Sequence, residues 1–77
     1  MQSLGNFFEA KADFLDTIKF NPYSAIAHYK CGLCSDELKQ YQLAINYYCE
    51  AIELDPIYPH SYMGRAQTNT TLGNYQE

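Results

Sequence analysis

The chain has 77 residues, of which 47% are hydrophobic and 18% charged, and its formal net charge is −4. A chain of this length forms one small domain at most, with a thin core of its own. Nine acidic residues against five basic ones argue against nucleic acid and anionic membrane surfaces as partners, because both are bound through clustered Lys and Arg. No apolar run approaches the roughly 20 residues that span a bilayer.

The first half of the chain predicts two helices. The first runs from about Phe7 to Phe20, and its apolar face is formed by residues at helical spacing: Phe7, Ala10, Phe14 and Ile18. The pair Asn21-Pro22 ends this helix, because the residue before a proline is disfavoured in the α region. Ser24 is expected to cap the second helix, which runs to about Lys39 and has an inner face of Ala27, Cys31, Cys34 and Leu38.

A tight turn at Lys39-Gln40 leads into the second half, which predicts two more helices. The third runs from Tyr41 to Leu54, with an apolar stripe of Ala44, Ile45, Tyr48, Ala51 and Ile52, and Asp55-Pro56 closes it. The fourth begins near Pro59, since a proline is tolerated in the first turn of a helix. It should stop at Leu72-Gly73, where the glycine suits a left-handed C-cap.

The aromatic content is high, with eight Tyr and four Phe. Helices of about this length joined by short turns lie antiparallel, so aromatic side chains can fill the space between layers. We expect this role for Phe14, Tyr41, Tyr48 and Tyr62. Small residues should let the helices approach closely, at Ala10, Gly32, Ala44, Ala51 and Ala66. The aromatic excess then needs no ligand.

An internal repeat with a period of 34 residues organises the chain. The segment that starts at Leu4-Gly5-Asn6 returns at Leu72-Gly73-Asn74, two periods later. Further pairs one period apart are Ala10 with Ala44, Phe14 with Tyr48, Ile18 with Ile52, Phe20 with Leu54, Asn21-Pro22 with Asp55-Pro56, and His28 with Tyr62. A register kept at this many positions indicates a solenoid of stacked helix pairs.

The pattern within each period resembles that of tetratricopeptide repeat proteins. Over residues 25–58 the small, aromatic, small and proline sites of the family's second helix are filled by Ala44, Tyr48, Ala51 and Pro56. The first helix of this repeat keeps Gly32 but departs from the family pattern at His28, Cys31 and Ser35. In the next repeat the four corresponding sites are filled by Tyr62, Arg65, Ala66 and Asn69. In the leading half-repeat, Ala10, Phe14, Thr17 and Pro22 fit the second helix. The resemblance implies an all-α superhelix of antiparallel helix pairs.

The repeat register divides the chain into three parts. Residues 1–22 are expected to be the second helix of a partial repeat, residues 25–58 one complete repeat, and residues 59–77 the first helix of a further partial repeat. Stacked repeats depend on their neighbours for burial. Two hypotheses follow: the chain is a fragment of a longer array, or it completes its stack by self-association between copies.

The resemblance also implies where a partner would bind, because family members mostly hold peptides on the concave surface formed by the first helix of each repeat. The complete repeat would present Ile26, Tyr29, Leu33, Asp36 and Glu37 there. The following partial repeat would present His60, Met63, Gln67, Thr70 and Thr71. Tyr29 and Leu33 could equally cover a neighbouring helix, and Asp36 and Glu37 could simply be a solvated helix face.

One subgroup of the family grips the C-terminal carboxylates of chaperone tails with Lys, Arg and Asn side chains. That clamp is not recognisable here, since Tyr29, Leu33 and Met63 occupy the groove sites, and Asp36 and Glu37 would repel an acidic tail. A protein or peptide segment with apolar or basic character is therefore the expected partner.

The segment Cys31-Gly32-Leu33-Cys34 has the spacing of a thiol redox motif. Such motifs place the first cysteine at a helix N-terminus after a strand, whereas both thiols fall within a predicted helix here. His28, Cys31 and Cys34 could supply three metal ligands, but a structural zinc site takes four. Buried packing is the preferred interpretation, and a thiol redox or metal site is a remote alternative.

The remaining features favour a non-enzymatic interaction scaffold without a cofactor. No glycine-rich phosphate loop, nucleophile motif or paired catalytic carboxylates occur, and Glu50 and Glu53 are read as surface charge. The sequon Asn69-Thr70-Thr71 falls within a predicted helix. Three cysteines, an odd number, and an N-terminus without the features of a secretory signal predict a reducing compartment, the cytoplasm before the nucleus or a cilium.

Overall fold

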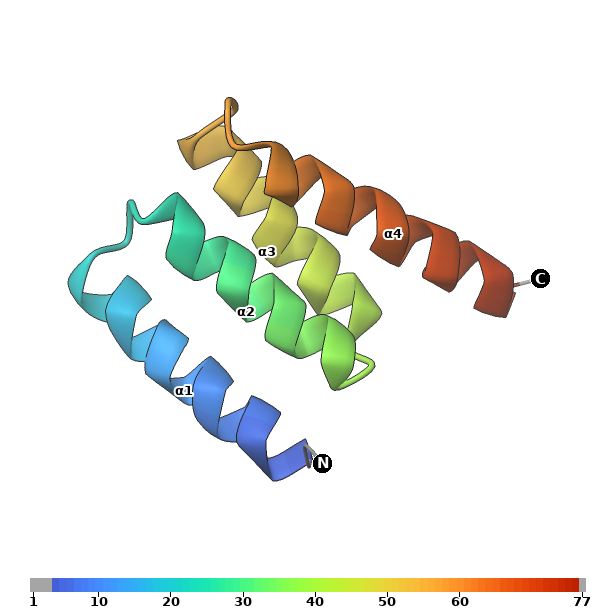
Figure 1. Cartoon of the computed structure of the whole chain (residues 1–77), viewed down its shortest axis with the longest axis horizontal. Coiled ribbons are helices and arrows are strands. Elements are labelled where there is room, and N and C mark those ends of the chain that lie inside the picture. The colour runs from blue at the N-terminus through green and yellow to red at the C-terminus, as the bar shows by residue number, and fades with distance from the viewer. Residues whose placement is uncertain (1–3, 77) are drawn as a thin grey trace.

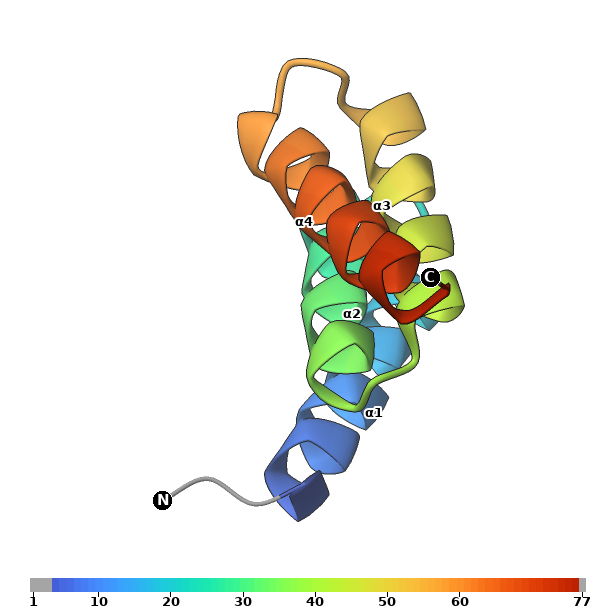
Figure 2. The same cartoon turned by 90° about the vertical axis from the view of Figure 1, so that its right-hand side faces the viewer.

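The computed structural model describes residues 4–76, which form four α-helices. These are α1 (Leu4–Phe20), α2 (Ala25–Glu37), α3 (Tyr41–Leu54) and α4 (Pro59–Gln76). Successive helices run antiparallel and stack side by side in chain order (Figure 1). Figure 2 shows α3 to one side of α2, with α4 crossing in front of both. The predicted all-α architecture of antiparallel helix pairs is confirmed.

Residues 1–3 and Glu77, which the predicted terminal half-repeats include, lie outside the described residues. Within residues 4–76, none of the helices combines the length and the apolar character that crossing a membrane requires.

The two loops that lead into α2 and α4 repeat the same backbone turn. The amide of Ser24 donates to the carbonyl of Asn21 over 3.2 Å, and one period later the amide of Tyr58 donates to the carbonyl of Asp55 over 3.2 Å. Ser24 also caps α2 as predicted, because its Oγ accepts from the amide of Ala27 at 3.2 Å. This repeated turn thus determines where the first helix of each pair begins.

The turn between α2 and α3 is set by Lys39, whose φ of 65° lies in the left-handed region. Helix α2 ends at Glu37, two residues earlier than expected, and the amide of Gln40 donates to the carbonyl of Ser35 over 2.8 Å. A non-glycine residue in this conformation is held there by the surrounding packing. Here α3 lies directly against α2 and forces the chain to reverse.

The prediction that the fourth helix stops at Leu72-Gly73 is wrong. Helix α4 continues through Gln76, and Gly73 has no positive φ, although it stands one period after Lys39. Glycine permits a left-handed turn but does not impose one. In the described residues no further helix follows α4 to draw the chain back. At the other end, α1 begins at Leu4, three residues before the expected start at Phe7.

The centre of the core is the ring of Tyr48, which is fully buried between α2 and α4. A β-carbon added at Gly32 would lie 2.5 Å from Tyr48 Cε1, and one added at Gly64 would lie 2.8 Å from the same atom. The ring therefore rests directly on the backbones of both helices. Around it the predicted small residues Ala44 and Ala51 are fully buried.

Two core assignments in α4 are wrong. Ala66 is exposed, and Tyr62 keeps 40% of its surface exposed, so neither fills the space between layers. The buried residues of α4 are instead Ser61, Gly64 and Thr68, which form a different face of the helix. Tyr62 and Ala66 stand one period after the buried residues His28 and Gly32, as the repeat register requires. Their side of α4, however, is not covered by another helix among the described residues.

The Tyr48 ring predicts opposite effects of one substitution at two glycines. Gly32→Ala should lower the free energy of unfolding by about 1–3 kcal/mol, because the new methyl overlaps the ring. Gly73→Ala makes the same chemical change in a helix, with nothing within 4 Å of the new methyl, and should be neutral or stabilising by under about 1 kcal/mol. Urea denaturation followed by circular dichroism measures both. Equal stability of the two variants would contradict the close contact at Gly32.

Candidate functional site

The residues predicted to face a partner lie along α2 and α4, the two helices on one side of the stack. We call their surface the α2–α4 face, and it comprises Ile26, Tyr29, Leu33, Asp36, Glu37, His60, Met63, Gln67 and Thr70. On α2 these residues recur at a spacing of three or four, with Asp36 and Glu37 adjacent at the end, so they share one side of the helix. The residues on α4 follow the same spacing one period later.

Two large apolar side chains of the α2–α4 face are mostly in solvent. Ile26 near the start of α2 is 56% exposed, and Met63 on α4 is 59% exposed. Neither is covered by the core, although Leu33 on the same side of α2 is half-buried. Large apolar groups left in water gain free energy when a partner covers them. An unbranched methionine also adapts to partners of different shape.

A cluster of aromatic rings joins the two helices of this face. The ring of Tyr29 packs on buried Tyr48 with a centroid distance of 6.0 Å, and meets Tyr58 edge-on at 5.5 Å. It also meets the His60 ring edge-on at 6.0 Å, and Tyr58 and His60 stack at 5.0 Å. Burial, and then the nearby Tyr58, raise the pKa of Tyr29. Tyr29 thus connects the core to the surface and brings α2 and α4 together.

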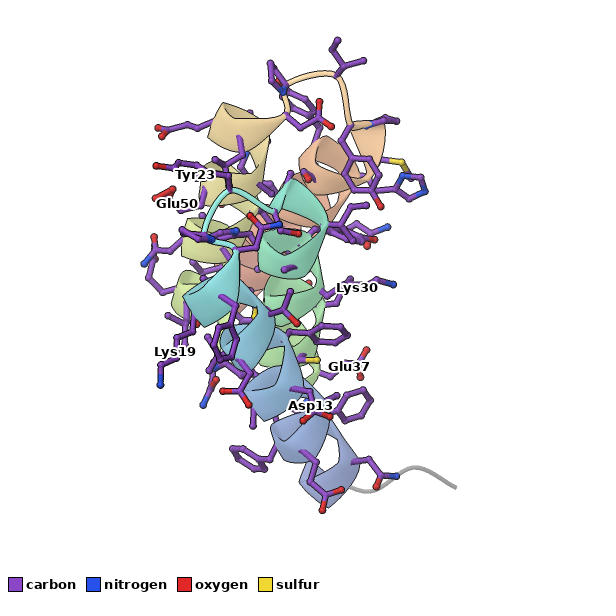
Figure 3. The ribbon with its side chains drawn as sticks, turned by 90° about the vertical axis from the view of Figure 1, so that its left-hand side faces the viewer. Asp13, Lys19, Tyr23, Lys30, Glu37 and Glu50 are labelled. Atoms are coloured by element: carbon purple, nitrogen blue, oxygen red, sulfur yellow. The ribbon has the colours of Figure 1, made fainter. Side chains whose placement is uncertain are left out.

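Tyr58 was not among the predicted site residues. It lies in the loop before α4, one period after the capping residue Ser24, so the repeat register assigned it no surface role. Its only sequence signal was an aromatic side chain next to Pro59. Lys30 was also missed; in Figure 3 its side chain extends from α2 to the same side as Glu37.

Charge along α2 is uneven, both on the α2–α4 face and at Lys30 beside it. Lys30 carries a positive charge at mid-helix, whereas Asp36 and Glu37 stand at the C-terminal end. The helix dipole adds a partial negative charge at a helix C-terminus. This end of α2 is therefore the more negative part of the face.

The α4 part of the face is polar and locally satisfied. His60, Gln67 and Thr70 are exposed, and the Thr70 hydroxyl donates to the carbonyl of Ala66 over 3.0 Å. The Thr71 hydroxyl makes the same type of bond to the carbonyl of Gln67 over 3.1 Å. Hydroxyls bonded within their own helix offer only their lone pairs to a partner. The polar residues of α4 can therefore set the position of a partner without anchoring it.

The described residues enclose no pocket, and no group of three or more metal-ligating side chains gathers among residues 4–76. The α2–α4 face is thus an open surface. His28 is buried, and its Nδ1 lies 2.8 Å from the carbonyl oxygen of Ser24. Because a carbonyl only accepts hydrogen bonds, Nδ1 carries the proton and donates it there.

The thiols of Cys31 and Cys34 lie in the core within α2, as expected for packing residues. Burial, and then the neighbouring Cys34, raise the pKa of the Cys31 thiol to about 11. Burial also raises the pKa of the Cys34 thiol. A reactive thiol requires the opposite shift, because the thiolate is the nucleophile. Cys49 is half-buried, and Arg65 Nη1 donates toward its Sγ over 3.9 Å.

Comparison with known proteins identifies the repeat. A sequence model of the tetratricopeptide repeat family matches residues 25–58. The chain is 32% identical, over 69 residues, to human tetratricopeptide repeat protein 6. That alignment covers 90% of the chain and 13% of the human protein's length. No solved structure matches the chain significantly.

The burial of the thiols predicts their reactivity with a thiol-specific reagent. With a pKa of about 11, Cys31 holds on the order of one thiolate per thousand at pH 8, so in the folded chain it should react far more slowly than Cys49. Its rate should rise as the pH approaches 11, because the raised pKa delays loss of the proton. Labelling followed by peptide mass spectrometry identifies each cysteine, and all three should react alike in urea. Preferential labelling of Cys31 or Cys34 at pH 8 would restore the redox interpretation.

Proposed function

Because the chain is built of tetratricopeptide repeats, we propose that it is a non-catalytic module that binds a protein segment on the α2–α4 face. Repeats of this family are generally motifs of protein–protein interaction. The observation that carries the proposal is the Tyr29 cluster, which joins the two helices near the N-terminal end of each. The chain spans a small part of its human relative, so the assembly it serves belongs to the same proposal.

The Tyr29 cluster and the exposed apolar groups favour a partner with apolar side chains. Tyr58 and His60 lie against Tyr29, with Ile26 and Met63 exposed on the same face. Aromatic rings present large contact area with few rotatable bonds, so less side-chain entropy is lost on binding. An extended or helical segment can lay apolar side chains across this area. We propose that it does so between Ile26 and Met63.

The charges favour a basic residue in the same segment. Asp36 and Glu37 stand where α2 ends, and the partial negative charge of the helix C-terminus adds to theirs. A Lys or Arg side chain placed there would pair with both, whereas an acidic tail would be repelled. Lys30, farther back on α2, restricts the basic residue to the end of the helix.

A binding role also fits the chemistry of the site better than catalysis. The α2–α4 face encloses no pocket among the described residues, whereas the substrates of enzymes are usually held in a concave cavity. Raised pKa values lower the thiolate fraction of Cys31 and of Cys34, and the thiolate is the nucleophilic form. We therefore propose that the face acts only by non-covalent contact.

Selection from a random peptide library displayed on phage tests this function. Peptides that combine apolar residues with Lys or Arg should be enriched, and their affinity can be measured by fluorescence anisotropy. Met63→Ser and Glu37→Lys should each weaken binding by about three- to tenfold, through lost apolar burial and reversed charge respectively.

Ile57→Ser is the matched control, because Ile57 is 86% exposed but lies in the loop outside the α2–α4 face. It should bind the selected peptides like the parent chain. Enrichment of acidic peptides, or equal effects of Ile57→Ser and Met63→Ser, would contradict the proposed site.

A further inference from the structure

Two exposed apolar side chains stand at the tips of equivalent loops. Tyr23, in the loop between α1 and α2, is 79% exposed, and Ile57, in the loop between α3 and α4, is 86% exposed. They are one period apart, so they occupy the same place in the repeat. Both loops lie at the same end of the stack (Figure 1).

Helices on either side of a loop leave this repeat position in water. Tyr23 is followed by α2, α3 and α4, and it remains exposed beside them. Ile57 is preceded by α1, α2 and α3, and it remains exposed as well. Because the two positions are equivalent, stacked neighbours before a loop tip and after it both fail to cover it. The exposure of Tyr23 and Ile57 is therefore a property of their place in the repeat.

The loop tips are ordered by hydrogen bonds. The amide of Ile57 donates to Oδ1 of Asp55 over 3.2 Å, and both loops contain the backbone turn that begins at Asn21 in one and at Asp55 in the other. A side chain that is already held in place loses less conformational entropy when a partner covers it. Single exposed apolar residues are common on protein surfaces. Their recurrence at the same ordered position of two successive repeats points to a contact.

Charges of opposite sign stand beside the two tips. Lys19 lies in the last turn of α1 and Glu53 in the last turn of α3, and both are exposed. Figure 3 shows Lys19 and Tyr23 on the same side of the molecule. Lys19 and Glu53 are one period apart, so Glu53 stands to Ile57 as Lys19 stands to Tyr23. We call these four residues the loop edge.

We propose that the loop edge binds the loop edge of a second copy of this chain. A two-fold axis that passes between the two loops places Tyr23 of one copy against Ile57 of the other. The same rotation brings Lys19 of one copy to Glu53 of the other, twice in each dimer. An interface of this kind is self-complementary and closes at two copies. It uses no residue of the α2–α4 face, so it is independent of peptide binding there.

Charge is the main argument for a second copy as the occupant. The two-fold axis exchanges the two repeats, so each charge meets its equivalent from the other repeat. Lys19 and Glu53 therefore form two pairs of opposite sign, whereas a loop edge with the same charge in both repeats would repel its copy. Asp16 and Glu50 are also equivalent and are both acidic. They lie about one helical turn farther from the loops, where their repulsion acts over a longer distance and is screened by salt.

The contact is small, so the dimer should be weak. Four loop tips and two exposed ion pairs bury less than the roughly 1,200 Å² of a standard stable interface. Exposed ion pairs also contribute little each. Sedimentation equilibrium from micromolar to millimolar concentration should show an average mass that rises toward that of a dimer and no further. Added salt should lower this mass, because it screens the pairs of Lys19 with Glu53.

Charge reversal tests the pairing. Lys19→Glu and Glu53→Lys should each weaken dimer formation by about tenfold, because each change places like charges opposite one another at two points of the dimer. The double variant that carries both changes in one chain regains two pairs of opposite sign. It should associate like the parent chain. Circular dichroism checks that each variant keeps its helices.

The apolar tips are tested by Ile57→Ser, which also separates this proposal from peptide binding. It should weaken dimer formation by about three- to tenfold through lost apolar burial. Peptide binding, measured at a chain concentration too low for dimers, should stay unchanged. Glu37→Lys is the matched control, because Glu37 lies at the far end of α2 from the loops. It should weaken peptide binding and leave the dimer unchanged.

Four results would overturn the proposal. The first is a parent chain that stays monomeric up to millimolar concentration, and the second is an average mass that rises well past that of a dimer. The third is a double variant that associates no better than the single charge reversals. The fourth is equal weakening of the dimer by Ile57→Ser and Glu37→Lys.

Discussion

The contact on which the other features of the molecule depend is that of the Tyr48 ring with the backbones of α2 and α4. Gly32 and Gly64 leave room for one aromatic ring between these helices, and the ring fills it. Because α2 and α4 both rest on the same side chain, their separation depends on the size of the Tyr48 ring. The spacing of the α2–α4 face is therefore determined in the core, below the surface that a partner would meet.

The Tyr48 ring also connects the core to the α2–α4 face. Tyr29 packs on Tyr48 from the side of the face, and Tyr58 and His60 pack on Tyr29. Burial is the main cause that raises the pKa of Tyr48 to about 12, and its hydroxyl lies near the buried Thr68 hydroxyl without a hydrogen bond of regular geometry. A buried hydroxyl without a partner costs about 1–3 kcal/mol. The core thus retains polar groups that apolar packing alone would not select.

The sequence determined the helices and their pairing, because each depends on local signals and on the 34-residue register. Ser24 could be recognised as a cap, Asn21-Pro22 and Asp55-Pro56 as helix ends, and Ala44, Tyr48 and Ala51 as core residues, without knowledge of any contact. The repeat register alone was insufficient to predict residues whose burial or backbone conformation depends on a neighbouring helix. Gly73 remained helical and Tyr62 and Ala66 remained exposed, since these positions depend on a helix packed against α4. Tyr58 was missed because ring contacts between loop and helix leave no periodic signal.

The same dependence on neighbours distinguishes two sides of α4. The side that faces α2 is held in place within the chain, since the Tyr29 ring of α2 meets the His60 ring of α4. The side with Tyr62, Arg65, Ala66 and Asn69 stands one period after the buried α2 residues His28, Cys31, Gly32 and Ser35, but none of its four residues is buried among the described residues. One repeat position is therefore a core site in α2 and a surface site in α4, because burial depends on the helix packed against a residue and not only on its place in the repeat.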